Sequence, residues 1–431
     1  MKIDMSRRAV LQGMVKTAGL GVFSSVPLSL FALAPYRGKL LMSLQLSGGM
    51  DVTSFADPKT NVPGQKEISR WARNLQIQTA GNIPYAPYGG NEKFFSKYYA
   101  SSLVINGVDA QTNSHSVGVV NNWSGRNSIG LPSVTALFAA VNQPQLPLAY
   151  LNFGGFGTTE GIIRDTRLSD TTILRNLALP NESAKLPVQN FLLAKDLENI
   201  QKLHASTVGN MVNSTTVAAG SLRNRELFLE SIARTQDVSR LVDFLPSTSQ
   251  LQTRRVVGGR SSTLHQQIQL ALLAFKADVA ISADLMEGGF DTHNNQDTLL
   301  PLLLANTTDA IDYLWNTAEQ LGIADRLVLV MGSDFGRTPY FNATEGKDHW
   351  PIGSYLVMEK NAKYTNKVIG ATDAGHNALP INPATLARDD KGVILKPGHF
   401  HKALRKYLGI DNSAITRRFS LTNIEDMNFF G

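Results

Sequence analysis

The chain has 431 residues, 43% of them hydrophobic, which is long enough for one large α/β domain with an insertion or for two domains. It contains no cysteine, which excludes disulfide bonds, thiolate metal sites, a cysteine nucleophile and a lipoprotein anchor. The formal net charge is +6, about half of it contributed by residues 1–34, and no basic stripe is interleaved with aromatic residues. Nucleic acid is therefore not expected as a partner.

Residues 1–34 have the features of an export signal. The segment Ser6–Leu11 contains an arginine pair typical of a twin-arginine signal, and an apolar stretch, 18–34, follows it. Residues 32–34 (Ala-Leu-Ala) resemble a cleavage site, although Pro35 would then be the first mature residue. We expect the twin-arginine export machinery to carry the protein to the periplasm or the extracellular space. It would stay at the membrane only if the segment were uncleaved, since the stretch is short for a bilayer span.

Apolar runs and helical patterns alternate along the rest of the chain. Buried strands are predicted at 39–46, 101–106, 146–153, 278–284, 326–331 and 354–358. Helices are predicted at 263–275, 296–321 and 399–408, the last closed by Gly409. This alternation predicts an α/β fold with a doubly wound, mostly parallel sheet covered by helices on both faces.

The stretch from about 160 to 260 has a different texture. It is rich in helix formers and poor in apolar runs, and in 222–245 the apolar residues recur at spacings of three and four. We interpret it as a helical insertion in a domain that spans 35–412, followed by a C-terminal tail, 413–431. No motif stands out within the insertion.

Acidic residues, histidines and a serine follow the ends of predicted strands. They are Asp51, Ser114, His115, Asp291, His293 and Asp334. In doubly wound sheets the ligand site lies outside the carboxyl ends of the strands, so one crevice is expected to gather them. Taken singly, an aspartate after two glycines is usually a turn residue. Together, carboxylates and imidazoles at one sheet edge predict a site for a divalent metal ion.

Six segments of the chain occur in the order seen in an exported bacterial family called domain of unknown function 1501. They are Leu46–Asp51, Ser114–His115, Gly288–His293, Ser333–Pro339, Asp348–Pro351 and Gly370–Asp373. The resemblance covers nearly the whole chain after the signal and is weakest in the insertion. That family is similar to the alkaline phosphatase and sulfatase superfamily. The resemblance implies an alkaline-phosphatase-like sheet with a metal centre at the strand ends.

The superfamily pattern implies a set of metal ligands, namely Asp51, Asp291, His293, Asp334 and His349. Two features depart from it. A single residue separates Asp291 from His293, where the phosphatases have a longer spacing, and Phe335 stands where they have a histidine. A second metal ion would lose a ligand unless His115 or Asp348 substitutes. His376 is a further spare candidate.

The chemistry implied by this set is hydrolysis of phosphate or sulfate esters. A divalent ion (Zn²⁺, Mn²⁺, Mg²⁺ or Ca²⁺) would polarise the ester of an anionic small molecule or glycan and activate Ser114 or water. Arg337 and His115 are the other candidate catalytic residues; Arg337, with Arg126, could hold the anionic oxygens. Ser114 could instead cap a helix, and Arg337 could form a surface salt bridge. The alternative function is non-catalytic binding of a cation or glycan by an exported protein with a degenerate site.

Overall fold

The structure, a computed structural model, describes residues 35–154, 156–167, 171–182, 189–213 and 238–431. The predicted export signal lies outside these residues. The chain divides into two compact units. One, here called the sheet unit, consists of Arg37–Leu174 and Asp243–Gly431, and Arg175–Val242 belongs to the other. No helix within the described ranges is both long and apolar enough to cross a bilayer.

The sheet unit is built on an eight-stranded sheet with the order β14-β4-β13-β10-β1-β9-β5-β6. The strands are β1 Leu40–Leu46, β4 Ser102–Asp109, β5 Tyr150–Asn152, β6 Thr166–Arg167, β9 Ser282–Glu287, β10 Leu327–Ser333, β13 Ile352–Glu359 and β14 Lys367–Ile369. Among these, β13 runs antiparallel to both of its neighbours and the other neighbouring pairs are parallel. The predicted mostly parallel sheet is confirmed, and each predicted strand has a counterpart in it.

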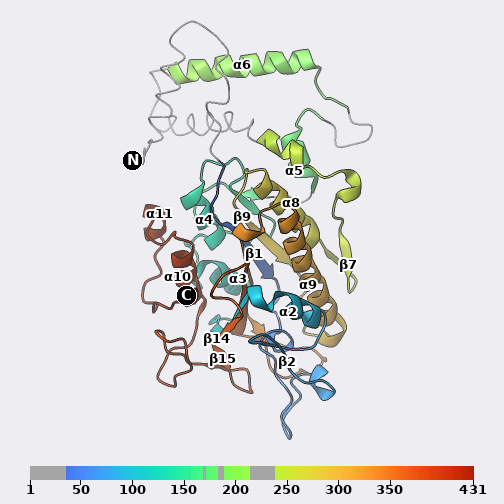
Figure 1. The fold of residues 1–431 in the computed structure, drawn as a ribbon, viewed down its shortest axis with the longest axis vertical. Helices are drawn as coiled ribbons and strands as arrows, with labels where there is room; N and C mark the ends of the chain where they lie inside the picture. Colours follow the sequence, from blue (N-terminus) through green and yellow to red (C-terminus); the bar gives the residue numbers. More distant parts are fainter. Residues whose placement is uncertain (1–34, 155, 168–170, 183–188, 214–237) are drawn as a thin grey trace. The chain divides into compact units, whose positions relative to one another are not determined.

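Helices cover both faces of the sheet (Figure 1). They are α2 Asn91–Tyr98, α3 His115–Ser124, α4 Val134–Asn142, α8 Leu264–Lys276, α9 Gln296–Gln320, α10 Pro397–Tyr407 and α11 Ala414–Arg417. Helix α8 packs on α9 and β9, and α4 packs on β1 and β9, while α3 packs against α10. All seven residues of the central strand β1 are buried, because helices shield both of its faces.

The sheet unit also contains short antiparallel pairs of strands outside the main sheet. They are β2 Gln78–Ala80 with β3 Ile83–Tyr85, β7 Arg255–Val257 with β8 Arg260–Ser262, β11 Gly336–Arg337 with β12 His349–Trp350, and β15 Ala371–Thr372 with β16 Ala378–Leu379. The β11–β12 pair matters for the site. It places Arg337 directly opposite His349 in register.

The stretch predicted as a helical insertion is more varied in the structure. It contains α5 Thr171–Ala178 and α6 Ala194–Asn213, but β6 at its start is an edge strand of the main sheet, and the β7–β8 hairpin occupies its end. The pattern expected at 222–245 falls largely outside the described residues, and its end, Ser239–Phe244, is a 3-10 helix.

The predicted C-terminal tail packs onto the sheet unit. The Phe430 ring stacks on Tyr407 with their centroids 4.6 Å apart, and Phe429 is fully buried. Arg405 of α10 donates a hydrogen bond to the carbonyl of Phe419 at 2.6 Å. The last residues therefore contribute apolar contacts to the fold.

Chain direction brings the candidate residues to one edge of the sheet. Strands β1, β9 and β10 are mutually parallel, so their carboxyl ends meet at the same edge. Because β13 is reversed, its first residue lies at that edge as well. Segments that leave β9 and β10 therefore meet the segment that enters β13.

Candidate metal centre

Three imidazoles gather around one carboxylate oxygen at this edge. The Oδ1 atom of Asp291 lies 3.1 Å from Nε2 of His293, 3.4 Å from Nε2 of His349 and 3.7 Å from Nε2 of His115. Ligand atoms of His115, Asp291 and His349 all lie within 4.8 Å of one another. Of these four residues, Asp291 and His293 follow β9, His349 lies in β12, and His115 begins α3.

The other nitrogen of each ring has a partner that can only accept. Nδ1 of His115 lies 2.6 Å from Oδ2 of Asp334, and Nδ1 of His293 lies 2.9 Å from Oδ1 of Asp348. Nδ1 of His349 lies 2.8 Å from the carbonyl oxygen of Asn113. Each Nδ1 must therefore carry the proton and donate, so in the neutral ring the lone pair of Nε2 faces the cluster.

This arrangement fits a metal ion. Nε2 of His293 and Nε2 of His349 are 2.9 Å apart, so two neutral rings oppose their lone pairs. An N–H of Arg337, 3.4 Å from Nε2 of His293, offsets this weakly, whereas a cation between the rings would remove it. Tetrahedral ligands bonded at about 2.0–2.2 Å are about 3.3–3.6 Å apart, close to the spacings around Asp291. Histidines that bind metals typically donate their second N–H to a carboxylate or a carbonyl, as all three do here.

The carboxyl group of Asp291 is held ionised. Partial burial would raise its pKa, but the hydrogen bond and the charge of Arg337 lower the pKa below its usual value. Arg337 Nη2 lies 2.5 Å from Asp291 Oδ1. An anionic oxygen in the middle of three Nε2 atoms is the charge that a divalent cation needs.

Arg337 is not placed as the sequence predicted. Its side chain is fully buried rather than open to a substrate. Its N–H groups are directed to the carbonyls of Gly48, Gly49 and Lys347, to Asp291, and to Nε2 of His293 at 3.4 Å. These contacts use the five donors of a guanidinium, so Arg337 cannot grip an anion and instead ties Asp291 to the loop after β1.

Gly48 allows that loop to approach Asp291 closely. Its φ is +120°, and a Cβ atom there would overlap the backbone nitrogen of Asp291. The backbone N–H of Gly48 also lies 3.2 Å from both carboxylate oxygens of Asp334. A glycine is therefore required where the loop passes between the two aspartates.

Asp334, a predicted ligand, contacts His115 on the side of the ring that faces away from the cluster. Besides His115 and Gly48, its carboxylate accepts from Nε2 of Gln45 at 2.5 Å. Its side chain is only 4% exposed, and it contacts His115 through Nδ1, not the Nε2 side where the ligand atoms converge. It therefore fixes the orientation of the His115 ring.

Asp51, also a predicted ligand, forms an internal ion pair instead. It is fully buried and accepts from Lys347 Nζ at 2.8 Å, Gln296 Nε2 at 2.7 Å and Thr53 Oγ1 at 2.6 Å. Burial alone would raise the pKa of Asp51, but the charge and hydrogen bond of Lys347 lower it. The carboxylate is saturated by these donors and contributes no ligand atom to the cluster.

Ser114, the predicted nucleophile, sits between two residues of the centre. Its neighbours in the chain are Asn113, which holds His349, and His115. Ser114 is at the N-cap position of α3, yet its side chain makes no capping hydrogen bond. Its exposed hydroxyl lies 3.3 Å from Oγ of Ser116. The capping alternative is thus not what the structure shows.

The two minor candidates are not members of the ligand cluster. Arg126 is exposed and donates to the carbonyl of Ile129. His376 is fully buried, with Nε2 3.6 Å from Asp57 Oδ2.

Sequence reasoning did not single out Lys347, Gln45 or Asn113. A loop lysine is normally solvated, so composition gives no hint that Lys347 is buried. Its place directly before Asp348 and His349 was the one available signal. Gln45 alternates with apolar residues in a buried strand, which marks it as a polar group with a buried partner.

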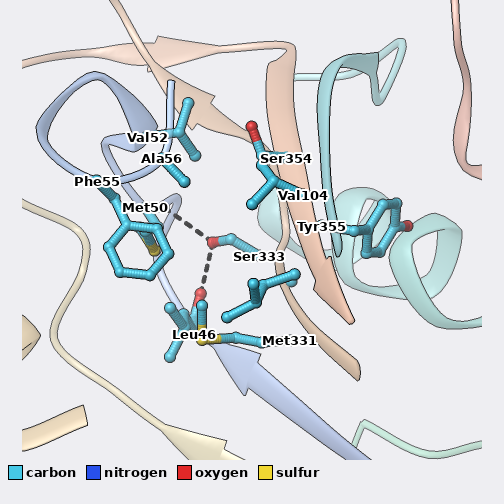
Figure 2. A pocket seen from close by; sticks show the side chains of 12 residues that line it. Leu46, Met50, Val52, Phe55, Ala56, Val104, Met331, Ser333, Ser354 and Tyr355 are labelled. Atoms are coloured by element: carbon cyan, nitrogen blue, oxygen red, sulfur yellow. Dashed lines mark hydrogen bonds between the residues drawn. The ribbon is translucent and has the colours of Figure 1, made fainter. Parts of the chain in front are cut away.

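A small pocket next to the centre is apolar and has a packing role. Figure 2 shows side chains from β1, the loop after it, β4, β10 and β13 pointing into it, including Leu46, Phe55 and Met331. Ser333 donates to the carbonyl of Leu46 and accepts from the backbone N–H of Met50. These contacts anchor the loop that carries Gly48 and Asp51.

Solved structures similar to this chain include sulfatase and phosphatase chains. Ps i-CgsB has a TM-score of 0.41 and 8% identity, covering 91% of this chain and 76% of that one. Alkaline phosphatase from the Antarctic bacterium TAB5 has 0.34 and 10%, covering 77% and 95%. BT1596, a 2-O GAG sulfatase, has 0.32 and 9%, covering 88% and 72%. Likenesses at this level do not indicate a reaction.

No curated protein matches the sequence. A family model described as "Protein of unknown function (DUF1501)" matches residues 178–423, which is more than half of the chain. The matched range includes Asp291, His293 and His349 of the cluster. The chain therefore belongs to the DUF1501 family.

Proposed function

We propose that the protein is an exported metal-dependent hydrolase of phosphate or sulfate esters. The observation that carries the proposal is the convergence of the three Nε2 atoms on Asp291, with every Nδ1 proton already directed to an acceptor. Three imidazoles and one carboxylate favour Zn²⁺ over Mg²⁺ or Ca²⁺, which prefer oxygen ligands.

Bound in this cluster, a divalent ion would polarise a non-bridging oxygen of the ester and lower the pKa of a nearby hydroxyl. His115, His293, His349 and Asp291 would hold it. Ser114 has its hydroxyl free of any capping role and stands at the start of α3, where the positive end of the helix dipole favours an anionic oxygen. It is the best candidate to attack the phosphorus or sulfur atom.

A second candidate function, binding of a cation or glycan without catalysis, is favoured by Arg337. Its guanidinium is fully buried and its donors are used within the protein, so it is not available to a substrate anion. Four protein ligands would also complete a tetrahedral shell, as in structural zinc sites.

The two functions are separated by activity and metal content measured together. Protein purified after export is analysed for metals, then loaded in turn with Zn²⁺, Mn²⁺, Mg²⁺ and Ca²⁺ and assayed on aryl phosphate and aryl sulfate esters. We expect Ser114→Ala to abolish hydrolysis while metal content and melting temperature stay nearly unchanged. The matched control is Ser116→Ala, because the hydroxyl of Ser116 lies 3.3 Å from that of Ser114. This variant should stay active.

Wild-type protein that retains metal but hydrolyses neither ester class would refute the hydrolase proposal and favour the binding function. Loss of activity in Ser116→Ala to the same degree as in Ser114→Ala would remove the specific role of Ser114.

A further inference from the structure

Lys347 is an unusual residue for the interior of the sheet unit. Its side chain and that of Asp51 are both 0% exposed, and Nζ lies 2.8 Å from Asp51 Oδ2 and 3.0 Å from Thr53 Oγ1. A lysine is almost never fully buried without a partner, because desolvating an ammonium group is costly. A buried pair of this kind therefore calls for an explanation beyond stability.

The pair lies next to the metal cluster. Asp51 follows β1, as Asp291 follows β9, so both carboxylates stand at the same edge of the sheet. Arg337 joins them: Nη2 contacts Asp291 Oδ1 at 2.5 Å and Nη1 donates to the carbonyl of Lys347 at 2.9 Å. The ammonium group of Lys347 thus lies at Asp51, and Arg337 alone links the backbone of Lys347 to Asp291 of the cluster.

The charges around this edge leave room for one divalent ion. The carboxylates joined by these contacts are Asp51, Asp291, Asp334 and Asp348, and the cations are Arg337 and Lys347. The histidines are neutral when their Nε2 atoms bind metal. Four negative and two positive groups leave two negative charges, which a single divalent cation neutralises.

We propose that the ammonium group of Lys347 occupies a second cation position at Asp51, so that the centre binds one divalent ion. The inference rests on the proposed function only in requiring the metal cluster. Replacing Lys347 with a small residue would leave the Asp51 carboxylate and the Thr53 hydroxyl facing a vacated space. Oxygen ligands of this kind suit a hard cation such as Mn²⁺.

The test counts metal ions per chain. Metal-free protein is equilibrated with Zn²⁺, freed of excess, equilibrated with Mn²⁺, and analysed for both metals. Wild type is expected to hold one Zn²⁺ and no Mn²⁺. Lys347→Ala is expected to hold one Zn²⁺ and to gain one Mn²⁺. The matched control is Asp51→Asn with Lys347→Ala, which keeps the vacated space, removes the carboxylate and should gain none.

Two ions in wild type, with one lost in Asp51→Asn, would overturn the inference while leaving the metal centre in place. A folded Lys347→Ala that gains no Mn²⁺ would overturn it as well. If Lys347→Ala does not fold without metal, its folding is measured with Mn²⁺ added: folding restored by Mn²⁺ supports the inference, and no restoration overturns it. Wild type that binds no metal would remove the proposed metal centre itself.

Discussion

Asp334 should control metal affinity without touching the metal. It orients His115 through the 2.6 Å contact between Oδ2 and Nδ1, and its side chain is only 4% exposed, so water cannot take its place. Both of its oxygens face donors: Gln45 and Gly48 at Oδ1, and Gly48 and His115 at Oδ2. In Asp334→Asn, either orientation of the amide turns its NH₂ group toward a donor.

The size of the effect follows from these contacts. Loss of a partner behind a metal-binding histidine typically weakens metal affinity 10–100-fold, about 1.4–2.8 kcal/mol. Because the amide of Asp334→Asn also opposes a donor, we expect the upper end of this range. Asp348→Asn is the matched control, since Asp348 holds His293 in the same way at 2.9 Å but is 56% exposed. Water can replace it, and an exposed pair is worth about 0–1 kcal/mol, so its loss should cost less than about fivefold.

The assay is competition for Zn²⁺ against a fluorescent chelator. The melting temperature of each metal-free variant is measured in parallel, which separates lost affinity from lost folding. An affinity loss in Asp348→Asn equal to or larger than that in Asp334→Asn would refute the reasoning. So would an unchanged affinity in Asp334→Asn.

Three further outcomes are expected. Gly48→Ala places a Cβ against the backbone of Asp291 at a φ of +120°, so it should weaken Zn²⁺ binding and cost about 1–3 kcal/mol of stability; unchanged urea unfolding and affinity would contradict this. Burial raises the pKa of Glu287 from 4.5 to about 7, so the folded state holds the proton of this carboxyl group more tightly than the unfolded state does. The resulting stabilisation of the folded state is fully present below pH 4.5 and is lost as the pH rises through 7. Glu287→Gln should therefore stabilise the protein by about 3 kcal/mol more at pH 8 than at pH 4.5, and equal gains in urea unfolding at both pH values would oppose it. Replacing Arg7 and Arg8 with lysine should leave the protein in the cytoplasm of a host that has the twin-arginine machinery, whereas unchanged periplasmic recovery would point to another route.

The strands were predictable because each is a buried apolar run with a polar residue just beyond its end. Leu40–Leu46 and Leu327–Ser333 lie within a few residues of their predicted bounds. The insertion was harder to predict, since the short strands of the β7–β8 hairpin carry too few apolar residues to show a period of two.

The sequence predicted the edge of the sheet at which the candidate site lies, but not all of the contacts that its residues make. Asp291, His293 and His349 lie together at the predicted edge, and His115, which the sequence offered as a catalytic residue or as a ligand of a second metal ion, lies in the same cluster. Asp51 stands at the right strand end. Its partner is Lys347, however, and only side-chain geometry decides whether a carboxylate faces an ammonium group or a metal ion.

The antiparallel direction of β13 determines where insertions in the chain would disturb the candidate metal centre. Had β13 run parallel to β10, the chain would have crossed the sheet first, and His349 would lie roughly 26 Å away, the length of an eight-residue strand. Instead, a single connection, 334–351, leaves and re-enters the sheet at the same edge. It carries Arg337, Lys347 and His349 together. Insertions within it would separate residues that act as a group, whereas longer loops at the opposite edge would leave their spacing intact.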